Sequence, residues 1–321
     1  MQILLNKVKE IFEQENFIHE PKELYEPIEY TLRLGGKRIR PVMLLAAHQM
    51  FGGDINQVSH AAIGIETFHN FTLLHDDLMD KSPLRRGKPT VYCKWDENTA
   101  VLSGDTMFAL AWRYFLAQPN SRLREILSCF NDTAIEVCEG QQYDMNFEQC
   151  DNITIADYMK MIRLKTAVLL AGALKLGALY ADAPQEDIDN LYEFGIHLGL
   201  AFQLQDDLLD GYGDVAVFGK QTGQDIRDNK KTYLYLKALE IAQPEQQQVL
   251  RELFSSTPDN SDDKVAKVLA IYQQINLRKY VEDAIQKEFD LAEHCLGLVR
   301  VDESAKQPLQ QLVDTLLGRK K

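Results

Sequence analysis

The chain has 321 residues, of which 35 are Lys or Arg and 48 are Asp or Glu, so its formal net charge is −13. So acidic a chain lacks the broad positive face that a nucleic-acid backbone or an anionic membrane surface requires, which argues against both partners. Hydrophobic residues make up 45% of the chain, as in ordinary globular proteins. No apolar run approaches the roughly 18 residues of a transmembrane segment.

The cysteine content indicates a reducing compartment. The chain has five cysteines and no CxxC pair, which predicts neither a disulfide framework nor a zinc knuckle. The N-terminal residues contain no apolar stretch of secretory length. We therefore expect a cytoplasmic protein.

Helical periodicity dominates the chain. Leu4, Val8, Ile11 and Phe12 fit one face of an opening helix, and long stretches rich in Ala and Leu follow. The ten prolines are expected at helix boundaries. No run alternates apolar and polar residues in the way that a half-buried strand requires.

Glycine-bearing breaks predict the connections between these helices. We expect turns at residues 35–36, 52–53 and 211–213, and loops at 219–223 and 255–261. No linker is long enough to separate domains, and no repeat of solenoid length stands out. The pattern predicts a single all-α domain over residues 1–321, built as a helical bundle.

One motif occurs twice. The segments LLHDDLMD (73–80) and QLQDDLLD (203–210) both contain Asp-Asp-x-x-Asp. On a helix the first and third aspartates of such a motif share a face, and the middle one is rotated by about 100°. The aspartates are Asp76, Asp77 and Asp80 in the first motif and Asp206, Asp207 and Asp210 in the second.

Like charges on one helix face destabilise a helix, and a divalent cation removes that repulsion. Carboxylate oxygens suit Mg²⁺, which takes one or two protein carboxylates together with water and phosphate oxygens. The alternative interpretation, a pair of solvated acidic helix ends, accounts less well for the repetition. The six aspartates are therefore predicted to bind Mg²⁺.

Basic residues flank both motifs. They lie in GGKRIRP (35–41), in RRGKPT (85–90), and in GKQTG (219–223) and DNKKT (228–232). Arg presents a fork of donors to phosphate oxygens, and Lys a compact positive charge. Any one of these residues alone would be interpreted as a surface charge. Together they predict a diphosphate held partly through Mg²⁺ and partly by direct contacts.

These motifs together resemble the trans-isoprenyl diphosphate synthases, the polyprenyl synthetase family. The segments GQQYD (140–144) and LKTA (164–167) add to the match, which runs from residue 35 to 232. The resemblance implies a helical bundle around a deep central cavity, with the two aspartate motifs facing each other across its mouth. It also implies head-to-tail condensation of isopentenyl diphosphate with dimethylallyl, geranyl or farnesyl diphosphate by a homodimer that uses about three Mg²⁺ ions.

The resemblance also implies roles for the aspartates. Asp76 and Asp80 are expected to bind two Mg²⁺ ions on the allylic diphosphate. Asp206 is expected to bind a third, with Asp207 and Asp210 in support.

Further residues are implied to hold the two substrates. Contacts to the allylic diphosphate are expected from Arg85, Lys165, Lys220 and Lys230. Contacts to isopentenyl diphosphate are expected from Lys37, Arg40, His69 and Arg86, although His69 has the alternative role of a buried, hydrogen-bonded histidine. Dipoles near the reacting carbon are expected from Thr166 and Gln203, supported by Gln141 and Asp144. The departing diphosphate is the implied base.

Product length is implied by residues on the helix of the first motif. Phe71 lies five residues before Asp76, roughly 7 Å along a helix. In this family that position commonly forms the floor of the pocket, and Phe71 followed by Thr72 points to a C15 or C20 product, with C20 preferred. The alternative is that Phe71 is only a core residue.

Two other functions stay open. A class I terpene cyclase shares the helical architecture, but usually carries an Asn/Ser/Glu metal motif in place of the second aspartate motif and needs no GGKRIRP segment. A non-catalytic subunit of a heteromeric synthase tends to lose one aspartate motif, whereas both are complete here.

Overall fold

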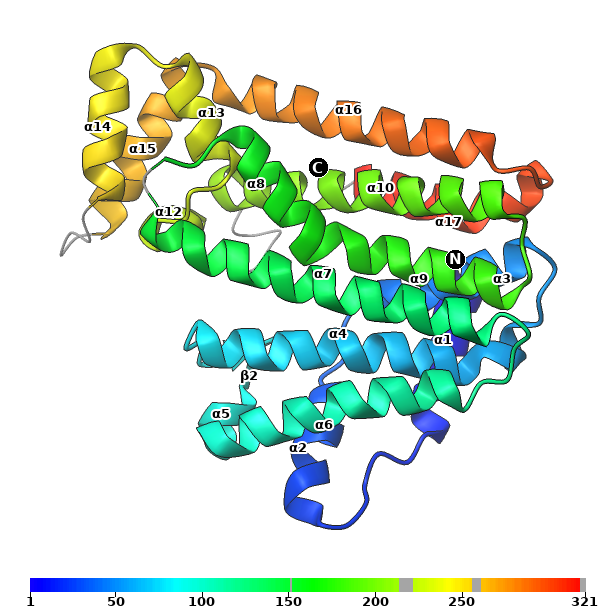
Figure 1. Ribbon diagram of the computed structural model, residues 1–321. Helices are drawn as coiled ribbons and strands as arrows, with labels where there is room; N and C mark the ends of the chain where they lie inside the picture. Colours follow the sequence, from blue (N-terminus) through cyan, green and yellow to red (C-terminus); the bar gives the residue numbers. More distant parts are fainter. Residues whose placement is uncertain (151, 214–221, 256–260, 318–321) are drawn as a thin grey trace. The chain divides into compact units, whose positions relative to one another are not determined.

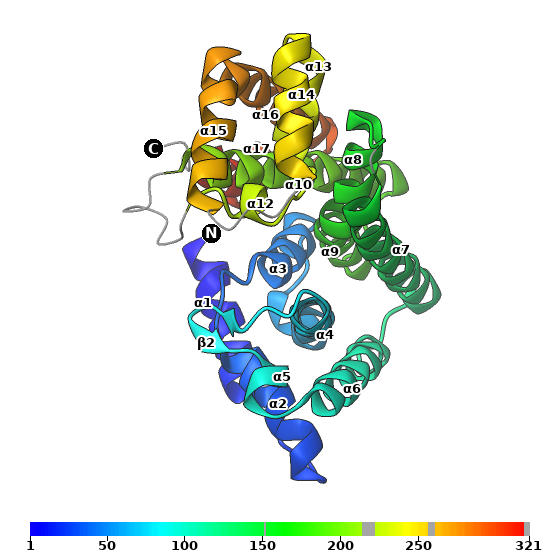
Figure 2. The same ribbon diagram turned by 90° about the vertical axis from the view of Figure 1, so that its left-hand side faces the viewer.

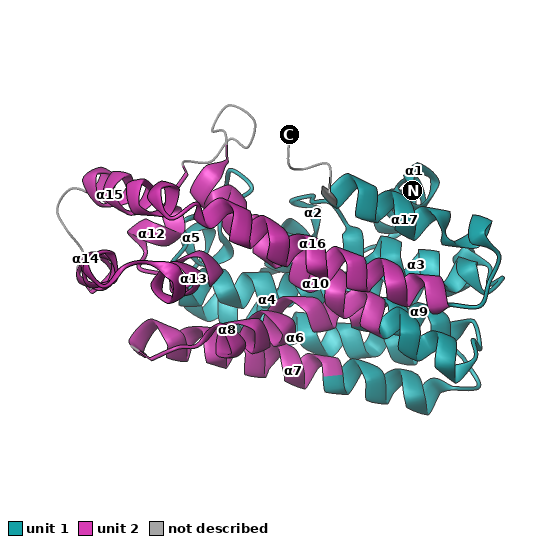
Figure 3. Cartoon of the chain, turned by 90° about the horizontal axis from the view of Figure 1, so that it is seen from above, with its two compact units in different colours: residues 1–132, 172–192, 299–321 teal, residues 133–171, 193–298 magenta. Residues whose placement is uncertain are grey.

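The computed structural model describes residues 1–150, 152–213, 222–255 and 261–317, and these are almost entirely helical (Figures 1 and 2). The all-α prediction is confirmed. The chain groups into two compact units, residues 1–132, 172–192 and 299–321 in unit 1 and residues 133–171 and 193–298 in unit 2 (Figure 3). Three of the four boundaries fall inside continuous helices, α7 (Leu123–Gln149), α9 (Val168–Tyr180) and α10 (Gln185–Tyr212).

Unit 1 carries the first aspartate motif. Besides its parts of the three shared helices, its elements are α1 (Gln2–Gln14), α2 (Lys22–Arg33), α3 (Ile39–Met50), the 3₁₀ turn η1 (Ile55–Val58), α4 (Ser59–Met79), β1 (Leu84–Arg85), β2 (Lys88–Pro89), α5 (Val91–Lys94), α6 (Glu97–Leu116) and α17 (Glu303–Leu317).

Helix α4 is the centre of unit 1. It packs along α6 and α3, and Figure 2 shows it end-on between them. Residues 61–68 are all buried and mostly apolar, which is the pattern of a helix buried all round. Phe68 of α4 is fully buried and meets the ring of Phe130 edge-on, with centroids 5.3 Å apart. This packing fixes the helix whose last turn carries the first motif.

Unit 2 carries the second aspartate motif. Besides its parts of the shared helices, its elements are α8 (Ile155–Ile162), the π-helical turn η2 (Arg163–Ala167), α12 (Gln224–Arg227), α13 (Tyr233–Ile241), α14 (Pro244–Phe254), α15 (Ser261–Gln274) and α16 (Leu277–Leu298). The motif lies near the end of α10.

Some predicted boundaries are wrong. Pro27 and Pro308 lie inside α2 and α17 instead of at their ends. Each proline removes the partner of a carbonyl four residues earlier, and those carbonyls belong to Glu23 and Ser304, exposed residues of the first turn. Water can satisfy these carbonyls, so the helices continue through the prolines.

The glycine turns are confirmed in two of three places. Gly35, Gly36 and Gly52 have φ values of 84°, 128° and 83°, which glycine adopts without steric cost. The turn predicted at 211–213 is wrong at its start, because α10 continues to Tyr212. The predicted loop at 219–223 lies mostly outside the described residues.

None of the described helices is long and apolar enough to cross a membrane.

Candidate active site

The first motif occupies the last turn of α4. Asp77 is buried, and both of its oxygens accept hydrogen bonds from Arg85 Nε at 2.8 and 2.7 Å. Arg85 Nη2 lies 3.8 Å from an oxygen of Asp76, which is partly exposed. Asp80 is exposed and follows the last residue of the helix. The middle aspartate therefore faces inward and holds an arginine, whereas the outer two stay nearer the surface.

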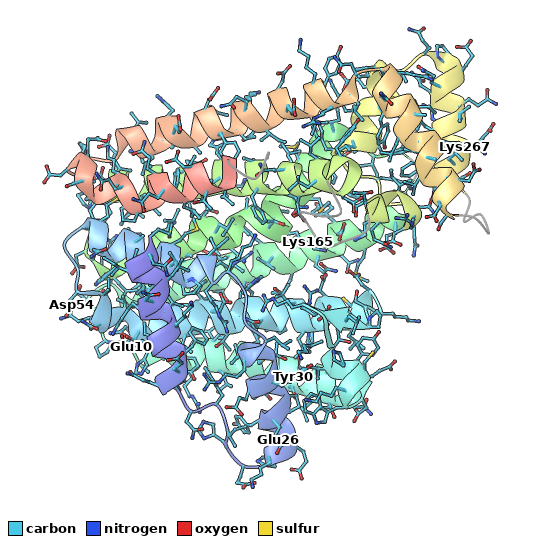
Figure 4. All side chains as sticks on the ribbon, turned by 180° about the vertical axis from the view of Figure 1, so that it is seen from behind. Glu10, Glu26, Tyr30, Asp54, Lys165 and Lys267 are labelled. Carbon is cyan, nitrogen blue, oxygen red and sulfur yellow. The ribbon has the colours of Figure 1, made fainter. Side chains whose placement is uncertain are left out.

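A short hairpin positions Arg85 and Arg86, and the sequence did not predict it. Leu84 pairs with Pro89 and Arg85 with Lys88, so a two-residue turn joins the strands. Both turn residues, Arg86 and Gly87, have positive φ, at 54° and 73°, as a type I′ turn requires. The hydroxyl of Tyr30, labelled in Figure 4, donates to the carbonyl of Pro89 at 2.7 Å and ties the hairpin to α2.

The GGKRIRP segment brings further cations to unit 1. Arg40 Nη1 lies 3.0 Å from His69 Nε2. Arg86 donates to the carbonyl of Gly35, and the guanidinium lies against Gly36, whose φ of 128° is a conformation that favours glycine. Lys37 is exposed. The four residues predicted to hold isopentenyl diphosphate thus belong to one unit. Arg40 contacts His69, and Arg86 contacts the GGKRIRP segment through Gly35.

His69 is a neutral donor. Burial, followed by the charges of Arg40 and other arginines, holds the pKa of His69 well below its ordinary value. Since an arginine has no acceptor, Nε2 must accept from Arg40, which places the ring proton on Nδ1. His69 can therefore offer an N–H to an anion without adding charge.

The second motif divides its roles in the same way. Asp206 is exposed, whereas Asp207 is buried and accepts from Tyr158 through Oδ2 and from Gln203 Nε2 at 3.1 Å through Oδ1. Burial raises the pKa of Asp207 to about 7. Asp210 accepts the backbone N–H groups of residues 224 and 225 at 3.2 and 3.1 Å, which caps α12.

Unit 2 contains a polar cavity of about 130 Å³ next to this motif. Its wall combines both charge signs with a hydroxyl and an amide. The predicted site residues in that wall are Asp144, Lys165, Thr166, Gln203, Asp207 and Lys230. Positions up to 86 residues apart in the sequence thus surround one small space.

Lys165 enters this cavity from an irregular turn. It lies in η2, a π-helical turn, and such turns are frequent at functional sites (Figure 4). Lys165 Nζ lies 2.6 Å from Asp144 Oδ2 of α7. A Cβ on Gly140 would stand 2.2 Å from the backbone nitrogen of Lys165, so α7 can approach η2 this closely only because residue 140 is glycine.

A chain of hydrogen bonds orients the polar groups beside Lys165. Thr166 Oγ1 donates to Gln203 Oε1 at 3.2 Å, and Gln203 Nε2 donates to Asp207. The Thr166 proton therefore points toward Gln203, and the lone pairs of its oxygen point away from that bond. Two oxygen dipoles with fixed orientation are suited to a neighbouring positive charge.

The donor set fits Mg²⁺. The aspartates offer hard carboxylate oxygens, and within the described ranges no three His, Cys, Asp or Glu side chains converge as a closed metal cage. Mg²⁺ is usually held by one or two carboxylates together with water and substrate phosphates. Asp80 and Asp206 are exposed and Asp76 is partly exposed, and these three would supply the carboxylates.

Three residues of unit 2 were not assigned a role from the sequence, and one predicted residue lies outside the described ranges. Tyr158 and Asp225 line the cavity, and Lys231 donates to the carbonyls of Phe147 and Cys150 at the end of α7. Asp225 and Lys231 follow the second motif closely, but Tyr158 has no local signal because only folding brings it to Asp207. The predicted contact residue Lys220 lies outside the described residues.

Comparisons with known proteins show the family to which the chain belongs. The polyprenyl synthetase family model matches residues 21–272. A short chain isoprenyl diphosphate synthase of Methanothermobacter thermautotrophicus is 35% identical, covering 93% of this chain and 91% of the relative. A geranylfarnesyl diphosphate synthase of Natronomonas pharaonis is 34% identical, covering 97% and 94%. The crystal structure of a geranylgeranyl pyrophosphate synthase aligns with a TM-score of 0.92 and 41% identity, covering 100% of this chain and 98% of that one.

The chain belongs to the polyprenyl synthetase family. It is a prenyltransferase, and the comparisons support short-chain trans-prenyl diphosphate synthase activity.

The close approach at Gly140 gives a first prediction. Gly140→Ala should lower kcat about 100-fold, because the added methyl group displaces the backbone of Lys165 and with it the adjoining Thr166. The measurement is steady-state prenyl transfer with an allylic diphosphate and isopentenyl diphosphate. The matched control is Gly297→Ala, where nothing lies within 4 Å of the new Cβ; it should keep wild-type kcat. Equal kcat in the two variants would contradict the role given to this contact.

His69 gives a prediction for the pH dependence of stability. Its pKa in the folded protein lies below the ordinary 6.5, so below pH 6.5 the unfolded chain binds more protons. The free energy of unfolding should therefore fall as the pH drops, by up to about 2 kcal/mol from this group between pH 7 and 5. Urea unfolding of the wild type and His69→Gln isolates this contribution. Identical pH profiles for the two proteins would show that His69 is protonated as readily in the folded protein as in the unfolded chain.

Proposed function

We propose that this prenyltransferase condenses isopentenyl diphosphate with an allylic diphosphate in a Mg²⁺-dependent, head-to-tail reaction. The allylic substrate loses its diphosphate to give a carbocation, the double bond of isopentenyl diphosphate attacks that carbon, and loss of a proton leaves a trans double bond. The released diphosphate takes the proton. The observation that carries the proposal is the cavity of unit 2, where Lys165, Thr166, Gln203 and Lys230 meet.

The residues on the wall of this cavity suit ionisation of a diphosphate ester. Lys165 and Lys230 bring positive charge to a leaving diphosphate, and Arg85 of unit 1 would add a fork of donors. The oxygens of Thr166 and Gln203, which a hydrogen bond between the two side chains orients, would stabilise a carbocation. Asp76, Asp80 and Asp206 would hold Mg²⁺, which would supply positive charge to the leaving group.

Isopentenyl diphosphate is assigned to the basic group of unit 1. Lys37, Arg40 and Arg86 supply three positive charges, and the neutral His69 supplies an N–H. Isopentenyl diphosphate keeps its diphosphate group in the reaction. Its site therefore needs cationic side chains that bind the group, and no metal to help the group leave. We further propose that both aspartate motifs act on one allylic diphosphate across a deep cavity within a single domain of residues 1–321.

We propose a C20 product. Phe71 is partly buried, and its ring stacks on Phe108 with centroids 5.4 Å apart. Further aromatic contacts with Phe68 and His75 hold it in place. A ring held this firmly would block a growing chain, and its position five residues before Asp76 sets the length. The similar crystal structure of a geranylgeranyl pyrophosphate synthase supports C20, although another relative is named as a geranylfarnesyl synthase.

We also propose that the chain acts as a cytoplasmic homodimer. Exposed apolar side chains gather on α6, where Leu102 and Leu116 are 59% and 54% exposed and Val101 is 44% exposed. Such a face on one long helix suits a second copy of the chain. Sedimentation measurements would establish the oligomeric state.

Product analysis tests the proposed function. The protein is incubated with Mg²⁺, isopentenyl diphosphate and dimethylallyl, geranyl or farnesyl diphosphate in turn, and the dephosphorylated products are separated by chromatography. We expect C20 alcohol from every primer and none after chelation of the metal. Absence of elongation with all three primers would refute the synthase, and a cyclic hydrocarbon from one substrate would indicate a terpene cyclase instead.

The floor assigned to Phe71 gives a further prediction. Phe71→Ala should shift the main product to C25 or longer, because loss of the ring deepens the pocket. The control is Phe17→Ala, which removes an equally large buried ring that packs on Phe12, away from the aspartate motif. An active Phe71→Ala enzyme with unchanged products would place the floor elsewhere.

A further inference from the structure

A buried carboxylate lies beneath the basic group of unit 1. Glu66 is on α4, one turn before His69, and is 2% exposed. Its Oε1 accepts from Arg38 Nη1 at 2.9 Å and from Asn70 Nδ2 at 3.2 Å. A buried carboxylate is unfavourable unless it is paired and hydrogen-bonded, and Glu66 meets that condition through Arg38.

Arg38 itself is fully engaged by the protein. Its side chain is 11% exposed, its guanidinium also donates to the carbonyl of Leu32, and it stacks over the ring of Phe12 at 4.3 Å. The residue lies between Lys37 and Arg40 in the sequence, but its guanidinium is taken up by Glu66 and the Leu32 carbonyl, whereas Lys37 is exposed. It is therefore an anchor and not a ligand for substrate.

The backbone at Arg38 depends on this anchor. Arg38 immediately precedes α3 and has φ 49° and ψ 37°, the left-handed region that side chains other than glycine rarely adopt. Such a conformation persists where surrounding contacts hold the residue. Because the chain turns at this residue, its conformation sets the directions of Lys37 on one side and Arg40 on the other.

Glu66 also acts on the neighbouring cations through its charge. Burial lowers the pKa of Arg40 to about 10, and the charge of Glu66 opposes this shift, as it does at Arg86. Glu66 Oε2 and Arg40 Nε are both buried and have no hydrogen-bond partner among the described residues. The negative charge of Glu66 thus offsets the repulsion between arginines that lie close together.

We propose that Glu66 is a positioning residue for the isopentenyl diphosphate site. By holding Arg38 in its left-handed conformation, it fixes Lys37 and Arg40 where, with His69, they bind the diphosphate of the attacking substrate. This inference rests on the proposed function, since it concerns one of the two substrates of that reaction.

The substitution Glu66→Gln separates positioning from simple electrostatics, because the two make opposite predictions. If Glu66 acted only through charge, its removal would leave the site more positive and would tighten anion binding. If Glu66 positions Arg38, the KM for isopentenyl diphosphate should rise about tenfold, while the KM for the allylic diphosphate stays within about twofold. Glu66→Asp, which keeps the charge, should recover part of the loss.

Two further measurements exclude a general loss of stability. Asp187→Asn is a matched control, because Asp187 is 1% exposed and accepts from the backbone of Arg300 at 2.9 Å, outside the basic group. It should lower the melting temperature without changing either KM. In a double-mutant cycle, Arg38→Gln should have little added effect in the Glu66→Gln background. Equal rises of KM in Asp187→Asn, or additive effects in the cycle, would overturn the proposal.

Calorimetric titration with isopentenyl diphosphate alone separates this inference from the proposed function. Weaker binding by Glu66→Gln than by the wild type supports the inference even if turnover is absent. Unchanged or tighter binding by Glu66→Gln overturns it while leaving an active synthase intact. No binding by the wild type overturns both.

Discussion

The constraint on which the site depends is that buried carboxyl groups must find hydrogen-bond partners inside the protein before any substrate arrives. Asp77 accepts from Arg85, Glu66 from Arg38, and Asp207 from Tyr158 and Gln203. Each of these acids is at least nine-tenths buried, where an unpaired charge would cost several kcal/mol. The inner carboxyl groups therefore support and orient the basic and polar groups around them, and the proposed function gives the metal to the more exposed carboxylates.

Close backbone packing is the second requirement. At Gly140 the absence of a side chain lets α7 approach the π-helical turn that carries Lys165 and Thr166. Gly199 similarly lets α10 approach Ala167 at the end of that turn, where a Cβ would stand 2.5 Å from Cα of Ala167. Two glycines from separate helices thus enclose one irregular turn. The irregular turn gives successive side chains directions that a regular helix would not give them.

Much of the fold and the site could be predicted from the chain itself. Apolar periodicity identified the helical class, and the repeated aspartate motif with its basic neighbours identified the chemistry, because both are local patterns. Pro27 and Pro308 were misplaced because a helix tolerates proline where the carbonyl that loses its N–H partner can reach water. That exposure depends on the tertiary structure. The Arg86-Gly87 hairpin was missed because its strands have only two residues each and show no alternation.

The sequence by itself determined which residue types carry the chemistry and how the aspartates are spaced, since the order of acids, glycines and cations is written along the chain. Only the tertiary structure decided which carboxylate of each motif faces inward, since burial depends on what packs against the helix. It also decided that Arg38 is held by Glu66 while Lys37 is exposed, and that Tyr158 supports Asp207. The cations of one short segment look alike in a sequence, but a left-handed backbone and a buried carboxylate from another helix distinguish Arg38 from its neighbours.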